Sequence, residues 1–192
     1  KHGVFEWVRR EDTGYHLTPV TADHRVGTTM WTRLNEAGIK VGVVNVPLTY
    51  PPQPLDGFLL CGFSAPPSAR DLTHPPGLLE EVEARFGTYS PTYQVDRSKL
   101  TARELYHALR THQRRIVEIG TALSESDDVQ VLILNLMLLD HSNHHIPTMD
   151  LVQRAIRDTD EDLGLLLTEF SPDNVLVISD HPSQEAVQSV RN

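Results

Sequence analysis

The sequence predicts an α/β protein whose sheet is largely parallel and flanked by helices on both faces. Helical and extended segments alternate along the 192 residues, the order that sheets with crossover helices require. Two apolar runs lead into an Asp-His pair: residues 131–139 are followed by Asp140-His141, and residues 175–178 by Ser179 and then Asp180-His181. A segment of helical periodicity separates the two runs. Apolar runs of this kind are typical of strands that are buried on both faces.

The first half of the chain predicts a helix followed by strands. Apolar residues at helical spacing between Gly27 and Ala37 indicate a short amphipathic helix that Gly38 ends. Groups of prolines on either side of residues 57–63 indicate stiff connections. The further elements expected are a strand over 40–46, a strand over 57–63, a short helix over 77–86 and a loop over 87–100.

The second half predicts a strand–helix–strand unit. Thr101 with Glu104 three residues later has the form of a capping box, which opens a long helix to about Leu123. A strand over 129–139, a helix over 149–170 and a strand over 174–179 follow. Such a unit favours parallel pairing with a right-handed crossover. Because no composition shift marks an interior boundary, we expect residues 1–192 to form a single domain.

Composition excludes several classes of protein. The chain is 39% apolar, enough to bury a core, but no apolar run reaches the ~18 residues of a membrane helix. A net charge of −9 argues against a nucleic acid polymer as partner, while a small phosphorylated substrate stays possible beside a metal. The single cysteine, Cys61, excludes an internal disulfide and favours a cytoplasmic location and an inert, buried role for its thiol. Composition does not set the oligomeric state.

Carboxylate and imidazole groups follow the two apolar runs, where strand ends would direct them into one crevice. Asp140 and His144 have the four-residue spacing that reaches one ion, and Asp180 is adjacent to His181. These ligands suit Zn²⁺ or Mn²⁺. The alternatives are that Asp140 caps the next turn and that Asp180 caps a helix beginning near residue 182. His141 and His145, beside the first motif, are expected to be solvated loop histidines. Histidines without such a motif are expected to be surface or packing residues: His2, His16, His24, His74, His107 and His112.

Four segments resemble the type I phosphodiesterase/nucleotide pyrophosphatase family of the alkaline phosphatase superfamily. They are His2-Gly3-Val4-Phe5-Glu6-Trp7, the block from Val26 to Tyr50, Leu139-Asp140-His141-Ser142-Asn143-His144, and Val177-Ile178-Ser179-Asp180-His181. The resemblance covers nearly the whole chain and implies an alkaline phosphatase-like α/β fold. It also implies a metal-dependent phosphoric ester hydrolase, in particular a phosphodiesterase.

The resemblance implies two divalent metal ions, Zn²⁺ or else Mn²⁺. Asp140 and His144 would serve one ion, and Asp180 and His181 the other. The family's Thr or Ser nucleophile would precede Lys1, and a further His ligand would follow Asn192, so the domain is expected to be incomplete at both ends.

The sequence departs from the family after His181, where Pro182 and Ser183 stand in place of a segment that contains glycines in the family. A dropped loop between His181 and Pro182 would explain that departure. Tyr50 is a candidate for stacking on a base or sugar of the substrate, with packing on the neighbouring prolines as the alternative. The rival functions are phosphomutase, phosphonate hydrolase or sulfatase activity on the same scaffold, or a non-catalytic homologue.

Overall fold

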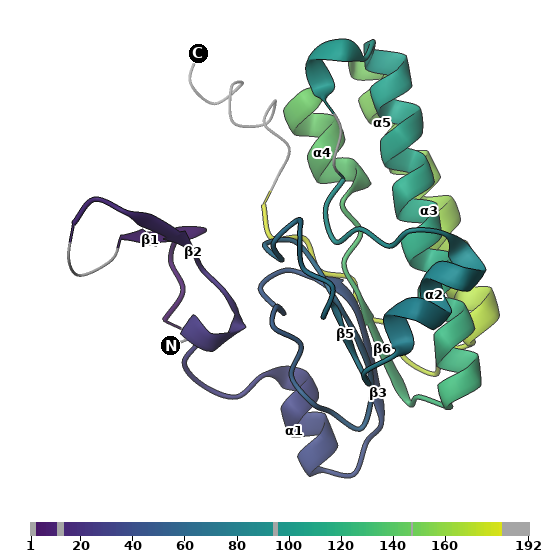
Figure 1. The fold of residues 1–192 in the computed structure, drawn as a ribbon. Helices are drawn as coiled ribbons and strands as arrows, with labels where there is room; N and C mark the ends of the chain where they lie inside the picture. Colours follow the sequence, from purple (N-terminus) through teal and green to yellow (C-terminus); the bar gives the residue numbers. More distant parts are fainter. Residues whose placement is uncertain (1–2, 11–13, 94–95, 147, 182–192) are drawn as a thin grey trace. The chain divides into compact units, whose positions relative to one another are not determined.

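The computed structural model describes residues 3–10, 14–93, 96–146 and 148–181, and Figure 1 gives the element labels. The chain divides into two compact units. The first comprises residues 1–94 and 118–135, and the second comprises residues 95–117 and 136–192. The expectation of a single domain over 1–192 stays a prediction.

A four-stranded sheet forms the centre of the first unit. The strands are β3 (Val41–Val46), β4 (Gly57–Cys61), β5 (Thr73–His74) and β6 (Val131–Leu134), in the order β5-β4-β3-β6. β3 pairs in parallel with both β4 and β6, whereas β5 is antiparallel to β4. Because β3 is buried along almost its whole length, its Val-rich sequence is that of a central strand covered on both faces. The predicted α/β class with a largely parallel sheet is confirmed.

Helices cover both faces of this sheet. α1 (Met30–Glu36) lies on one side, and α2 (Leu78–Phe86) with the last turns of α3 (Ala102–Asp127) lies on the other (Figure 1). The helix predicted between Gly27 and Ala37 is confirmed, and the Thr29 hydroxyl caps it by accepting a hydrogen bond from the Thr32 amide at 3.1 Å.

A short hairpin precedes these elements. β1 (Val8–Arg10) pairs antiparallel with β2 (Leu17–Pro19), and a single 3₁₀ turn, η1 (Ala22–His24), follows. His24 belongs to that turn, where its Nδ1 accepts a hydrogen bond from the Thr21 amide at 3.0 Å. It is therefore a structural histidine, as its lack of a motif predicted.

The carboxyl end of β3 is irregular and tightly packed. Asn45 sits at a bulge in the β3–β4 register with a φ of 59°, and it is 2% exposed. Its side-chain amide donates a hydrogen bond to the Asn135 carbonyl at 3.1 Å, just beyond the end of β6. Gly62, which follows β4, lies so close to the backbone of Asn45 that a Cβ at Gly62 would be 2.4 Å from the Asn45 carbonyl. Only glycine allows this approach of two backbone segments.

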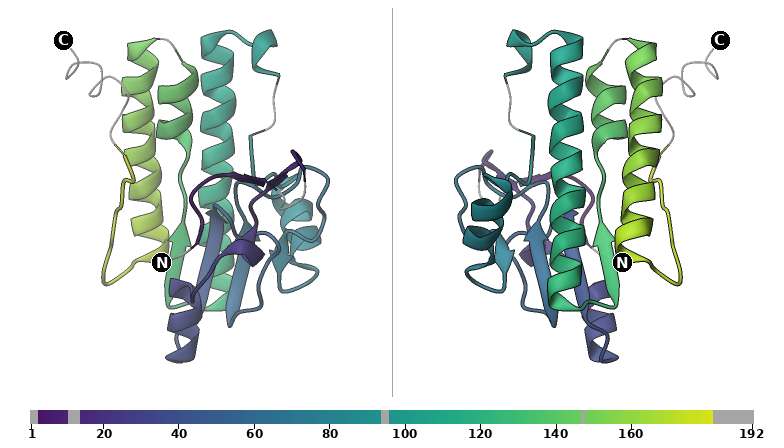
Figure 2. Two further views of the ribbon diagram at one scale, coloured as in Figure 1. Left: turned by 90° about the vertical axis from the view of Figure 1, so that its left-hand side faces the viewer. Right: turned by 90° about the vertical axis from the view of Figure 1, so that its right-hand side faces the viewer.

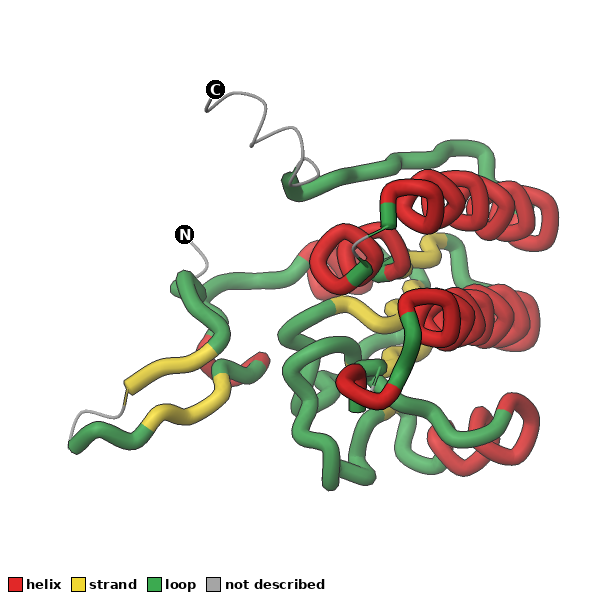
Figure 3. Tube along the Cα trace, turned by 90° about the horizontal axis from the view of Figure 1, so that it is seen from above, coloured by secondary structure: helices red, strands yellow, loops and turns green. Residues whose placement is uncertain are grey.

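Three helices build the second unit: the first part of α3, α4 (Leu138–His145) and α5 (Met149–Phe170). They lie side by side in Figure 2 and are seen nearly end-on in Figure 3. The predicted capping box is confirmed, because the Thr101 amide donates to the Glu104 carboxylate and the Glu104 amide donates to the Thr101 hydroxyl. The helix predicted over 149–170 is also confirmed. No helix within the described ranges has the length and apolar character to cross a bilayer.

Two predictions about the strands of the second half are wrong. The strand predicted over 129–139 is limited to β6, because residues 138 and 139 are already helical. The strand predicted over 174–179 does not form, since these residues have no ladder partner among the described strands. The side chains of Val175 to Ile178 are instead 52–80% exposed. The expected strand–helix–strand unit is therefore absent, and Asp140 lies on a helix rather than at a strand end.

Candidate metal centre

α4 places Asp140 and His144 on one face of the same short helix. Residues four apart are neighbours on a helix surface, and the His144 Nε2 lies 3.2 Å from the Asp140 Oδ1. Asp140 is in the first turn of α4, where the positive end of the helix dipole stabilises a carboxylate. The helix thus supplies one carboxylate and one imidazole that converge on a single point.

His181 reaches the same point from the segment that follows α5. Its Nε2 lies 3.4 Å from the Asp140 Oδ1, and its ring centroid is 6.1 Å from that of His144. One ligand atom from each of Asp140, His144 and His181 lies within 4.8 Å of the other two. We call these three residues the Asp140 cluster.

Asp180, the fourth predicted ligand, is not part of the Asp140 cluster. Its side chain is 91% exposed, and its nearest oxygen is 3.8 Å from the His181 Nε2. The structure therefore brings together three of the four predicted ligands. They converge through a helix and an extended segment, not through two strand ends as the sequence suggested.

The chemistry of the Asp140 cluster fits a divalent cation. One carboxylate oxygen and two imidazole nitrogens are donors that both Zn²⁺ and Mn²⁺ accept. The three side chains are 33–49% exposed, so an ion and a substrate can reach them from solvent. The role of Asp140, His144, Asp180 and His181 as ligands stays a prediction.

The histidines around the cluster occupy different environments. His141 was expected to be a solvated loop residue, but it lies within α4 and is only 9% exposed, with its ring 5.8 Å from that of His145. His145 is exposed, although it too is helical. On α3, the pKa of His112 is lowered to about 4, chiefly by burial and to a smaller extent by repulsion from His141 and Arg115. His112 is therefore a neutral packing residue near pH 7.

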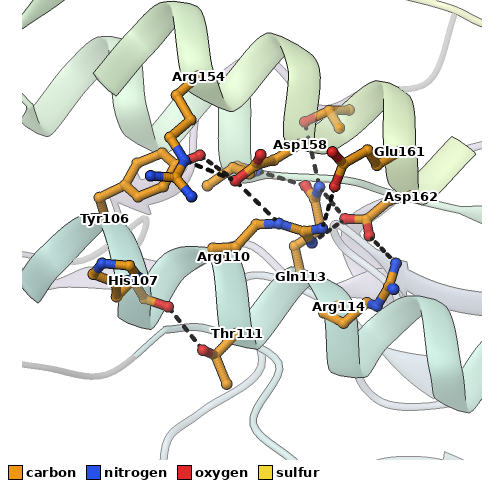
Figure 4. Close-up of polar contacts among 12 residues, drawn as sticks. Tyr106, His107, Arg110, Thr111, Gln113, Arg114, Arg154, Asp158, Glu161 and Asp162 are labelled. Carbon is orange, nitrogen blue, oxygen red and sulfur yellow. Dashed lines mark hydrogen bonds and ion pairs between the residues drawn. The ribbon is translucent and has the colours of Figure 1, made fainter. Parts of the chain in front are cut away.

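A buried ionic network lies between α3 and α5 in the second unit (Figure 4). At its centre is the Asp162 carboxylate, whose side chain is 0% exposed. It accepts hydrogen bonds from the Arg110 guanidinium at 2.6 Å, the Gln113 amide at 2.8 Å and the Arg114 guanidinium at 2.9 Å. A buried carboxylate is tolerated when its charge is paired and its lone pairs are satisfied, and here both conditions hold.

Asp158 extends this network by one helical turn. It accepts a hydrogen bond from the Tyr106 hydroxyl at 2.5 Å, and its carboxylate is 3.3 Å from the Arg110 guanidinium. Burial and the Asp158 carboxylate both raise the pKa of Tyr106, so its hydroxyl remains a donor at any physiological pH. None of these residues was predicted from the sequence to have a role. Their signal was a four-residue spacing of Arg110 and Arg114 on one helix and of Asp158 and Asp162 on another.

Two further predicted residues lie in the first unit. The Tyr50 hydroxyl donates a hydrogen bond to Asp71 at 3.1 Å, and burial together with that carboxylate raises the pKa of Tyr50. Its role in substrate stacking stays a prediction. Cys61 is buried in β4 as expected, and burial raises its pKa to about 12, which leaves its thiol protonated and unreactive near neutral pH.

The fold and the Asp140 cluster together define an α/β protein with a candidate site for a divalent cation. The chain belongs to the type I phosphodiesterase / nucleotide pyrophosphatase family, whose sequence pattern it matches over residues 1–189. The family is part of the alkaline phosphatase superfamily, so the resemblance and the fold class expected from the sequence are both confirmed. Searches of curated proteins and of solved structures gave no match.

Proposed function

We propose that this protein is a metal-dependent hydrolase of phosphoric diesters or pyrophosphates, in which Asp140, His144 and His181 bind a catalytic divalent cation. The observation that carries the proposal is the convergence of their three ligand atoms within 4.8 Å. Family membership supports the reaction class, because the family is that of type I phosphodiesterases and nucleotide pyrophosphatases.

The residues of the Asp140 cluster have complementary roles in this proposal. Asp140 supplies the negative charge that compensates the cation, and it does so from the first turn of α4. His144 and His181 would bind through imidazole nitrogens that carry no proton, because a proton and a metal ion compete for the same lone pair. A cation bound there would supply Lewis-acid stabilisation of the phosphoryl oxygens.

The proposal includes a second divalent ion that binds through Asp180. Support for it comes from the family resemblance and from the proximity of the Asp180 carboxylate to His181. A Thr or Ser nucleophile outside residues 1–192 belongs to the same proposal. Zn²⁺ suits this mixture of nitrogen and oxygen ligands best, and Mn²⁺ is the second choice.

Metal content of the purified protein tests the assignment. We expect about two cations per chain by the two-ion arrangement of such hydrolases. His144→Ala should remove at least one of them, and Asp180→Ala should remove only the second. His16→Ala is the matched control, since His16 is an exposed histidine of the first unit. Unchanged metal content in His144→Ala would contradict the assignment of the Asp140 cluster.

Substrate preference tests the reaction class separately. We expect faster hydrolysis of bis(nitrophenyl) phosphate than of nitrophenyl phosphate, with both activities lost in Asp140→Asn. A preference for the monoester would favour a phosphatase or a phosphomutase on the same scaffold. No hydrolysis of either ester by a metal-loaded protein would favour a non-catalytic homologue.

A further inference from the structure

We propose that Gln113 is a positioning residue for the metal centre, which acts by fixing the first turn of α4. This inference rests on the proposed function, because it assigns Gln113 a part in holding Asp140 and His144 where they bind the cation. Within the described part of the chain, the Gln113 side chain makes its hydrogen bonds to Leu138, Thr159 and Asp162 and none to the Asp140 cluster, so its effect on the ion would be indirect.

The first step is the contact between Gln113 and α4. The Gln113 Oε1 accepts a hydrogen bond from the Leu138 amide at 2.9 Å. Leu138 is the first residue of α4, and the amides of a first helical turn have no acceptor within their own helix. The side chain of the residue before it, Met137, makes no capping hydrogen bond. Gln113 therefore supplies a cap from another helix.

The second step is the need of α4 for such a contact. With eight residues, α4 is shorter than helices that are stable in isolation, so its position depends on tertiary contacts. Asp140 is two residues beyond Leu138 in the same turn. A shift of the Leu138 backbone would therefore move the Asp140 carboxylate, which both histidines of the cluster approach.

The third step is what orients Gln113. Its Nε2 donates to the buried Asp162 carboxylate at 2.8 Å, while its Oε1 faces the Leu138 amide. The reverse amide orientation would place oxygen against carboxylate and NH₂ against N–H, so chemistry fixes this one. Arg110 and Arg114 hold Asp162 in turn. The buried network thus specifies both the place and the direction of the acceptor that α4 requires.

The experiment compares zinc affinity and hydrogen exchange in the full chain of wild type and Gln113→Met. Methionine keeps the volume but makes neither hydrogen bond. We expect a zinc dissociation constant about 10-fold higher, as for other residues that orient metal ligands, and faster exchange of the Leu138 amide. Thr159→Ala is the matched control, because it removes only the weaker 3.3 Å contact of Gln113 and should change neither quantity.

Two outcomes overturn the inference: an unchanged zinc affinity in Gln113→Met, or a Leu138 amide that stays protected. Gln113→Asn, whose shorter amide cannot reach both partners, gives the same test should the methionine variant not fold. A wild-type protein that binds neither zinc nor manganese would overturn the proposed function itself. That failure is distinguishable because it is seen without any substitution.

Discussion

Replacing Asp162 with alanine tests whether the buried network stabilises the second unit. The substitution removes a fully buried carboxylate and leaves the Arg110 and Arg114 guanidinium groups without their shared acceptor. Removal of one partner from a buried ion pair costs about 3–5 kcal/mol. Arg110 keeps its contact with Asp158, and the Arg114 side chain is 40% exposed and can turn towards water. We therefore expect a loss near the lower end, about 3 kcal/mol.

Urea unfolding followed by circular dichroism measures this loss as a change in the free energy of unfolding. Glu161→Ala is the matched control, because Glu161 is 70% exposed and 3.7 Å from the same Arg110. An exposed pair of that kind contributes less than about 1 kcal/mol. Asp162→Asn keeps the shape of the side chain but not its charge, and we expect it to lower the free energy of unfolding nearly as much as Asp162→Ala. If Asp162→Ala were no more destabilising than Glu161→Ala, the network would have no stabilising role.

Two more predictions concern backbone packing and pH. Gly62→Ala should destabilise the protein by about 2 kcal/mol, because the new Cβ would overlap the Asn45 backbone. Gly164→Ala, at an open helical position of α5, should instead stabilise the protein by about 0.5–1 kcal/mol. Thermal unfolding should therefore show a lower melting temperature for Gly62→Ala and a higher one for Gly164→Ala. Changes of the same sign in both variants would contradict the packing argument. The low folded pKa of His112, about 4 against 6.5 unfolded, means that the unfolded chain binds more protons in this interval, so stability falls as pH drops from 6.5 to 4. Urea unfolding at pH 7.5 and at pH 4.5 measures the free energy of unfolding that each protein loses on acidification. This loss should be about 2 kcal/mol smaller in His112→Gln than in wild type, and an equal loss would refute the shifted pKa.

Helices were the most predictable part of this fold. α5 has the limits expected from its periodicity, and the Thr101–Glu104 pair marked the start of α3 because capping is a local interaction. The predicted limits of the strands were wrong where the local hydrophobic pattern did not distinguish a strand from a helix. The apolar run 131–139 continues from β6 into α4, and periodicity alone does not separate a buried strand from the start of a buried helix.

The Asp140 cluster was predictable in its members but not in its construction. The four-residue spacing of Asp140 and His144 is a local property, which survives whether the segment is a turn or a helix. The approach of His181 and the outward direction of Asp180 depend on the path of the chain after α5, which no local pattern specifies. Gln113 was missed for a similar reason, since its two partners lie 25 and 49 residues away in sequence.

The spacing of the buried charges restricts how α3 and α5 can align in the second unit. Tyr106, Arg110 and Arg114 recur every four residues on α3, and they face Asp158 and Asp162, also four apart, on α5. A slide by one helical turn would break part of this pairing, because it would move Tyr106 and Arg114 away from their present acceptors. Leucine-rich faces alone tolerate such slippage, whereas buried charge does not. The same residues that stabilise the helix pair therefore also specify its alignment.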